Sequence, residues 1–223
     1  KLSTTRLVTS AAISPDGESV VYSVRNGLRP SLWIRQLPSA TNIEIIPPVD
    51  GGYYEIVFSP DGNSLFFSRG SDARRGQTDI FRLPVRGGIP QKLAADTQGW
   101  LSISRDGDRI SFVRCAYTDD EYCSLWVANA SDGGNEKKLV TSQRPIRIAD
   151  NEISPDGTKV AFALGQSRNQ ANEFRLMEVG IDGGQQREIT SEQFFNVKSA
   201  TWLPDQSGLL VTAARIPNKY FRI

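Results

Sequence analysis

The stretch ISPDG at residues 13–17 decides the fold, because the chain repeats it at regular intervals. It returns unchanged at 153–157, as FSPDG at 58–62, as ISRDG at 103–107 and, in degenerate form, as LPDQSG at 203–208. From the serine of each copy to the next, with Leu203 in the serine position of the last, the steps are 45, 45, 50 and 49 residues. A period of about 40–50 residues indicates a repeat architecture such as a β-propeller.

The motif Ser-Pro-Asp-Gly has the composition of a tight turn between two antiparallel strands. Proline presets the backbone for the second turn position, aspartate tolerates the third, and glycine adopts the left-handed conformation that closes a bulged hairpin. The residues around the first copy, AAIS (11–14) and SVVYSV (19–24), alternate and are rich in β-branched side chains, as strands are. We therefore expect a hairpin at each copy, whose serine has a structural role and not a catalytic one.

Two further strand-like segments accompany each hairpin, and no amphipathic helix is evident. The third segments include SLWIRQL (31–37) and SLWVANA (124–130), and the fourth include IEIIP (43–47) and KKLV (137–140). We assign KLST (1–4) to the first repeat as its opening strand and YFRI (220–223) to the last as its closing strand. The sequence thus predicts an all-β β-propeller of five four-stranded antiparallel blades, at about 1–37, 43–85, 91–130, 137–180 and 187–223.

Two explanations remain open for how such a ring closes. The five blades could close by side-chain packing alone, or they could be part of a larger propeller. We favour the larger propeller, because the last strand stops without its expected turn and because closure is what removes exposed strand edges. The chain begins at Lys1 without a charged-then-apolar leader, so it has the character of a mature product or an excised domain.

Composition argues against several function classes. The 26 basic and 25 acidic residues leave a net charge of +1, and no basic stripe with interleaved aromatics favours nucleic acid. No apolar run reaches the roughly 18 residues of a spanning helix, so we expect no membrane contact by this segment. The chain has no histidine, which removes the commonest general base and the commonest zinc ligand. We expect no enzyme, no cofactor and no metal site.

The repeat AAISPDGESVVYSV…SLWIRQL…IEIIP resembles the TolB-like, WD-repeat-like propeller repeat of bacteria over the whole chain. The segments 31–48, 79–93 and 202–215 are similar to the C-terminal propeller of bacterial proteins that carry an N-terminal serine/threonine kinase or winged-helix DNA-binding domain. This resemblance implies a membrane-anchored regulator with a periplasmic propeller. The kinase motifs and the winged helix are absent from this stretch, so those activities cannot be assigned to these residues.

The two cysteines, Cys115 and Cys123, are the ends of the loop CAYTDDEYC. Adjacent antiparallel strands would bring them within bridging distance, and a lone pair around one loop favours a disulfide in an oxidising compartment. The alternative is two free thiols in a cytoplasmic protein.

Candidate binding residues lie in loops that propeller topology places on one face, opposite the Ser-Pro-Asp-Gly turns. One group is charged: Arg69, Arg74 and Arg75 in one loop and Asp119, Asp120 and Glu121 in the next. A second group is expected at the mouth of the central channel: Tyr53, Tyr54, Trp100, Asp150 and Asn151. The alternative for the charges is simple solvation, and for the aromatics packing between blades, as is also expected for Trp33 and Trp126.

Three functional hypotheses are consistent with these features. The first is a non-catalytic binding propeller, the sensor or interaction domain of a larger bacterial regulator, with a protein or peptide partner. The second is the gating propeller of a prolyl-oligopeptidase-like serine hydrolase whose catalytic domain lies outside this chain. The third, a lyase or lactonase propeller with a metal in its channel, requires inward-facing histidines or clustered carboxylates and is disfavoured by the histidine count.

Overall fold

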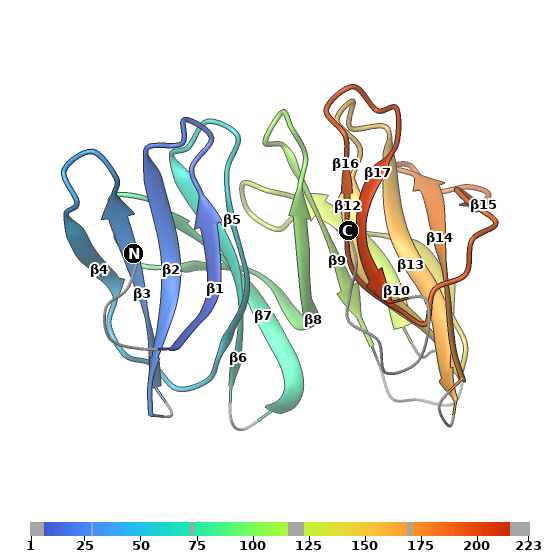
Figure 1. Cartoon of the computed structure of the whole chain (residues 1–223), viewed down its shortest axis with the longest axis horizontal. Helices are drawn as coiled ribbons and strands as arrows, with labels where there is room; N and C mark the ends of the chain where they lie inside the picture. The colour runs from blue at the N-terminus through green and yellow to red at the C-terminus, as the bar shows by residue number, and fades with distance from the viewer. Residues whose placement is uncertain (1–6, 28, 72–73, 116–122, 169–170, 215–223) are drawn as a thin grey trace. The chain divides into compact units, whose positions relative to one another are not determined.

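The computed structural model describes residues 7–27, 29–71, 74–115, 123–168 and 171–214, and over these ranges the chain forms strands and turns without any helix (Figure 1). Its contacts divide it into two compact units, Lys1–Leu101 and Ser102–Ile223. The strand pairings within the described ranges are antiparallel. The all-β antiparallel expectation is therefore confirmed.

Unit 1 holds the strands of the first two repeats. They are β1 (Leu7–Ile13), β2 (Ser19–Asn26), β3 (Arg29–Gln36), β4 (Asn42–Ile46), β5 (Tyr53–Phe58), β6 (Ser64–Ser71), β7 (Arg74–Pro84) and β8 (Gln91–Ile103), whose last residues belong to unit 2. The strands β1 to β4 form one sheet in that order, and β5 to β8 pair in sequence order as well.

Unit 2 repeats the pattern. Its strands are β9 (Arg109–Arg114), β10 (Cys123–Asn129), β11 (Lys137–Ser142), β12 (Ile146–Ile153), β13 (Lys159–Arg168), β14 (Ala171–Gly180), β15 (Arg187–Glu188), β16 (Asn196–Trp202) and β17 (Leu209–Ala214). A four-stranded sheet contains β12 to β15, and β16 and β17 form a hairpin.

Each Ser-Pro-Asp-Gly motif forms the predicted hairpin turn and hydrogen-bonds within itself. In the first copy Ser14 Oγ donates to Asp16 Oδ1 at 2.5 Å and accepts from the backbone N–H of Ser19 at 2.9 Å. Gly17 has a φ of 72°, the left-handed conformation that glycine adopts without steric cost. The same serine-to-aspartate bond recurs at Ser59, Ser104 and Ser154. These hydroxyls are held by the turn, in agreement with a structural role.

The turn carboxylates give a pH-dependent stability that can be measured. Hydrogen bonds from Ser59 Oγ and from Asn63 lower the pKa of Asp61 to about 2. Because this folded-state pKa lies below the unfolded value, the contribution is complete above about pH 4 and is lost as pH falls through about 2. We expect urea unfolding to show a stability difference between wild type and Asp61→Asn that shrinks between pH 5 and pH 2. A difference that stays constant over this range would contradict the assignment.

The sheets group the strands differently from the expected blades. The segment 43–47 was expected to open the second blade, but its residues 43–46 lie in β4, which pairs with β3. The reason is the turn before it: Gln36 N donates to the Thr41 carbonyl and folds β4 back onto its predecessor. The segments expected to open the later blades form the start of β8, most of β11 and, with residues 187–188, β15; these strands likewise pair with β7, β10 and β14. The expected boundaries at 37/43, 85/91, 130/137 and 180/187 therefore cut through hairpins, and residues 1–4 and 220–223 lie outside the described part.

One strand joins two repeats without a break. β8 is 13 residues long; its first part pairs with β7, and it continues toward the hairpin with β9, so that β5 to β11 count as one seven-stranded sheet. The described part of the chain thus has four sheets where five separate blades were expected.

The core of unit 1 is apolar and aromatic. Leu32, Leu65 and Phe67 are fully buried, and the Phe67 ring packs edge-on to Tyr53 with ring centres 5.5 Å apart. Phe67 also stacks on Phe81 at 5.6 Å. This cluster fixes the start of β5, where the candidate site lies. Unit 2 has its own fully buried residues, among them Ile110, Phe112, Leu125, Ile148 and Phe162.

The two tryptophans that recur in the third strands have the same environment, but they are not fully buried. Trp33 Nε1 donates to Ser31 Oγ and Trp126 Nε1 to Ser124 Oγ, both at 2.8 Å. The cations of Arg114 and Lys138 lie over the Trp126 ring, at 4.9 and 5.1 Å from its centre. Their recurrence therefore reflects a local sheet-surface motif more than a dry core position.

Candidate functional site

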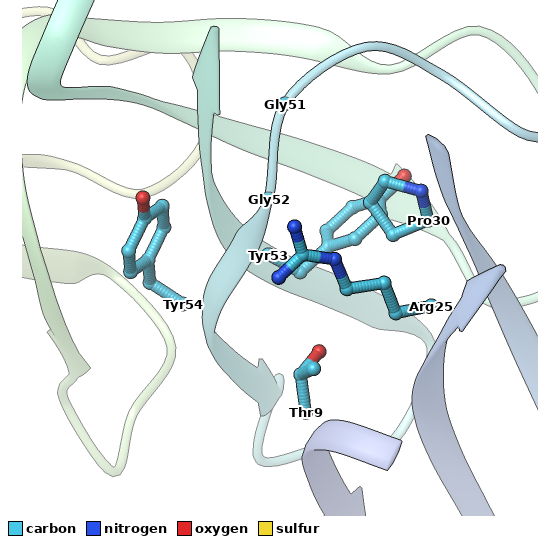
Figure 2. Close-up of a pocket in the computed structure, with 7 residues that line it drawn as sticks. All are labelled: Thr9, Arg25, Pro30, Gly51, Gly52, Tyr53 and Tyr54. Carbon is cyan, nitrogen blue, oxygen red and sulfur yellow. The ribbon is translucent and has the colours of Figure 1, made fainter. Parts of the chain in front are cut away.

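A pocket of about 390 Å³ opens in unit 1 beside the start of β5. Figure 2 shows its lining, which comes from β1, β2, β3, the loop that enters β5 and the start of β5: Thr9, Arg25, Pro30, Gly51, Gly52, Tyr53 and Tyr54. Its volume lies near the lower end of the range that small-molecule sites occupy. Two residues proposed from the sequence, Tyr53 and Tyr54, therefore line this pocket.

Arg25 is the charged group of this pocket. It extends from β2 toward Tyr53 and Thr9 (Figure 2) and is exposed. Its Nε donates to the Gly27 carbonyl at 3.1 Å, which holds the guanidinium in place. Within the described ranges it has no carboxylate partner. The nearest loop acid, Asp50, is instead paired with Arg29, with Nε to Oδ1 at 2.7 Å and Nη2 to Oδ2 at 3.2 Å.

Thr9 contributes a hydroxyl next to Arg25. Its Oγ1 lies 2.5 Å from Ser23 Oγ, and either oxygen can be the donor of this hydrogen bond. Ser23 is completely buried on β2, whereas Thr9 is exposed on β1. A register shift between Val8 and Ser10 marks a bulge in β1 at Thr9.

Tyr53 forms the buried wall of the site. The residue is 4% exposed, and its hydroxyl has no hydrogen-bond partner among the described residues. Burial raises the pKa of this phenol, and the nearby Arg69 cation opposes the rise. The Arg69 guanidinium itself lies over the Phe81 ring at 4.5 Å, so it supports the core beneath the site.

Tyr54 points to the other side of β5, away from Arg25 and Thr9 (Figure 2). It is 59% exposed, and its ring rests on backbone: a Cβ at Gly70 would lie 3.1 Å from the ring, and one at Gly99 would lie 3.3 Å from the Tyr54 Cβ. The next residue after Gly99 is Trp100, which is partly exposed. The structure therefore brings Tyr54 close to the Gly99 backbone, next to Trp100 in the chain.

Asp150 and Asn151 lie in unit 2 and hold strands together. Asp150 has a φ of 52° at a bulge in β12 and accepts a hydrogen bond from the backbone N–H of Ala200 in β16 at 2.5 Å. Burial raises its pKa to about 6 against the opposing effect of that bond. Asn151 Oδ1 accepts from Ser111 Oγ on β9 at 2.5 Å, while its buried Nδ2 lacks a partner in the described part of the chain. These contacts give both side chains a role between neighbouring strands.

The remaining sequence candidates can be placed only in part. Arg74 and Arg75 begin β7, and their side chains lie outside the described residues, as do Asp119, Asp120 and Glu121. Cys115 and Cys123 form a disulfide with an S–S distance of 2.00 Å.

Sequence reasoning missed Arg25, Thr9 and the Gly51–Gly52 entry as parts of the site. Arg25 lies near the end of β2, and no pattern in the sequence RNGLRP (25–30) separates it from Arg29. The decisive fact is that Asp50 pairs with Arg29, and this depends on the fold.

The structure offers no preformed metal site where it is described: no group of three or more histidine, cysteine, aspartate or glutamate residues lies close enough to hold an ion. Over the same ranges no helix has the length and apolar character needed to cross a membrane.

No protein-family model matches the sequence, and neither does the sequence of any curated protein. Solved structures do match it. A protein assigned as TolB from Agrobacterium tumefaciens is 20% identical with a TM-score of 0.69, covering 94% of this chain and 71% of that chain. An oligogalacturonate lyase from Vibrio parahaemolyticus is 12% identical with a TM-score of 0.70, covering 96% of this chain and 62% of that chain.

A prolyl endopeptidase is 15% identical with a TM-score of 0.66, covering 93% of this chain and 32% of that chain. This chain therefore spans less than two thirds of the length of the lyase and of the endopeptidase. At such identities the likeness concerns the backbone arrangement and not the chemistry. The chain has the β-propeller-like fold that these proteins share, with TolB-type propellers among its structural neighbours.

Proposed function

We propose that this chain is a non-catalytic β-propeller module that binds a small ligand or a segment of a partner protein at the pocket beside β5. The observation that carries the proposal is the pocket itself. Four strands and a glycine loop bring one cation, unpaired among the described residues, together with a hydroxyl and an aromatic wall around about 390 Å³. Concave sites with apolar walls and few polar groups are typical ligand sites.

The proposal excludes chemistry by this chain alone. Its sequence has no histidine to serve as a general base. The repeated serines that a nucleophile search would find are engaged with aspartates in the turns, for example Ser59 with Asp61. The carboxylate that accepts this hydrogen bond is a poor general base, because the pKa of Asp61 is lowered to about 2.

We place the module in a larger bacterial regulatory protein, as its sensor or interaction domain, outside the cytoplasm. The disulfide between Cys115 and Cys123 supports an oxidising compartment. The TolB neighbours support a bacterial propeller of this type. The sequence resemblance to propellers attached to a kinase or winged-helix domain supports the regulatory context.

The match to a prolyl endopeptidase supports a second candidate, the gating propeller of a serine hydrolase. The reading frame beyond Ile223 distinguishes the two candidates. An α/β-hydrolase domain there favours the gating role, and further propeller repeats favour the binding module.

Filling the pocket tests the proposal. Gly52 lines it and has no positive φ. A Cβ there would face the Tyr54 ring at an ordinary 3.6 Å, so Gly52→Leu places a side chain on the Tyr54 side of the pocket without backbone strain. We expect a panel of amino acids, short peptides, sugars and organic acids, screened by ligand-observed NMR, to include saturable binders. Their affinity should fall about tenfold or more in the variant, a loss of about 1.4 kcal/mol.

Gly208→Leu is the matched control, because a Cβ at Gly208 would also make only an ordinary contact, 3.8 Å from Leu203. It should bind as wild type does. Binding that survives Gly52→Leu, or a panel without any binder, would remove the support for a ligand site at this pocket.

A further inference from the structure

We infer that the pocket beside β5 recognises a single carboxylate, paired with the Arg25 guanidinium and hydrogen-bonded by Thr9. The inference rests on the proposed function and deepens it by naming the chemical class of the ligand. It is based on the net charge of the pocket lining, on the unused hydrogen-bond donors of Arg25 and on the direction of the hydrogen bond between Ser23 and Thr9.

The charge balance of the lining is +1. Of the seven described lining residues, Arg25 is the only one with a charged side chain. The acid closest in sequence to the glycine entry, Asp50, is neutralised by the two-point ion pair with Arg29. An anion entering the pocket therefore meets an uncompensated cation and no repelling carboxylate in the described lining.

The donors of Arg25 are mostly unused. Its Nε–H goes to the Gly27 carbonyl, and neither terminal nitrogen has a partner in the ranges that the structure describes. A guanidinium fixed at Nε presents its two terminal nitrogens as a planar fork, which matches the two oxygens of a carboxylate. The bond to Gly27 thus holds the fork in position before a ligand arrives.

The buried serine beside Thr9 decides where the threonine proton goes. Ser23 is completely buried, and Thr9 Oγ1, at 2.5 Å, is the partner that the described residues offer its hydroxyl. A buried hydroxyl donates where it can, so Ser23 donates to Thr9. The proton of the exposed Thr9 hydroxyl is then free to point to a ligand, as a second donor next to Arg25.

One cation and one hydroxyl suit a monoanion. A phosphate carries about −1.5 to −2 charges at neutral pH and would be only half neutralised here. A carboxylate is matched in both charge and shape. Pro30 and Tyr53 add apolar wall, which suits a carboxylate attached to a ring or an apolar group. Two sources have this chemistry: the free C-terminus of a peptide and a sugar acid.

Two pairs of ligands, each an acid and a neutral analogue of similar shape, test whether the carboxylate charge is recognised. One pair represents a peptide C-terminus and the other a sugar acid. The first pair is N-acetylphenylalanine and its amide, and the second is glucuronate and glucose. Affinities are measured by ligand-observed NMR titration with the full chain at low salt, because a partly exposed ion pair weakens as salt increases. We expect the acid of at least one pair to bind at least about tenfold more tightly than its neutral partner, and the pair that responds identifies the source.

Three variants test the assigned groups. Arg25→Ala should abolish the preference for the acid, Arg25→Lys should keep part of it, and Thr9→Ser should retain it because the hydroxyl remains. Arg86→Ala, at an exposed arginine in the turn after β7, is the control for loss of one positive charge and should leave the preference intact. Unfolding midpoints of all variants verify that each is folded.

The outcomes separate this inference from the proposed function. Equal binding of acids and neutral analogues, or an acid preference that Arg25→Ala leaves unchanged, overturns the carboxylate assignment. If such binding is still lost in Gly52→Leu, the pocket remains a ligand site of another specificity. Failure of both acids to bind wild type also overturns the assignment, and the wider panel then decides whether the pocket binds anything.

Discussion

Replacing Phe67 with alanine is expected to lower the free energy of unfolding by about 3–5 kcal/mol, the usual cost of removing a buried phenylalanine ring. Phe67 is fully buried and packs against the rings of Tyr53 and Phe81. Its loss leaves a cavity under the start of β5, and because the Tyr53 ring forms the wall of the pocket, ligand affinity should fall as well. Urea unfolding of wild type and variant, followed by circular dichroism, measures the first effect.

Phe67→Leu is the graded control, since it keeps an apolar side chain of intermediate size and should cost clearly less than the alanine variant. The cavity also explains why a substitution that contacts no ligand should alter binding. A loss below about 1 kcal/mol in Phe67→Ala would show that the aromatic cluster is not the packed core that the structure describes.

The disulfide between Cys115 and Cys123 should stabilise the chain by about 2–3 kcal/mol, because it closes a short loop that the unfolded chain would otherwise leave open. The bond joins residues eight positions apart. We expect a reducing agent to shift the urea unfolding midpoint of wild type downward and to leave the double variant Cys115→Ser/Cys123→Ser unaffected. The reagent can act nowhere else, because the chain has only these two cysteines. An unchanged midpoint in wild type would contradict a stabilising bridge.

The turns of this fold could be predicted from the sequence because their chemistry is local. Asp16 accepts a hydrogen bond within the turn and Gly17 adopts a positive φ, as these residue types do in other tight turns, and the other copies repeat this arrangement. The grouping of strands into sheets was harder to predict from the sequence. It depends on whether the loop before a strand or the loop after it forms the hairpin turn. The loop before β4 closes with the bond from Gln36 to Thr41, and no motif distinguishes it from the loop after β4.

The continuity of β8 was also beyond sequence reasoning. The segment around Asp96 and Gly99 has the composition of a loop, yet both residues adopt positive φ within a continuous strand. Such bulges let a strand continue through residues that otherwise favour turns.

The candidate site could be predicted in its aromatic part and not in its charged part. Tyr53 and Tyr54 could be selected from the sequence because aromatic side chains in a loop at a concave surface are suited to binding. Arg25 could not be separated from the other arginines of the chain, because its free state depends on an ion pair formed by Arg29 and Asp50. Whether a charged loop residue is available to a ligand can be judged only when its ion-pair partners in the fold are known.

Tyr54 packs on the backbone of Gly70 and Gly99, so the orientation of its exposed ring depends on residues that a ligand would not contact. A single methyl group at Gly70 would lie 3.1 Å from the ring and 3.5 Å from the Gln77 carbonyl, so the tyrosine would have to tilt. A substitution at Gly70 would therefore move the Tyr54 ring, and so change the binding surface, while every residue that contacts a ligand stays the same. The orientation of this exposed aromatic side chain is thus set by the glycine backbone on which it packs.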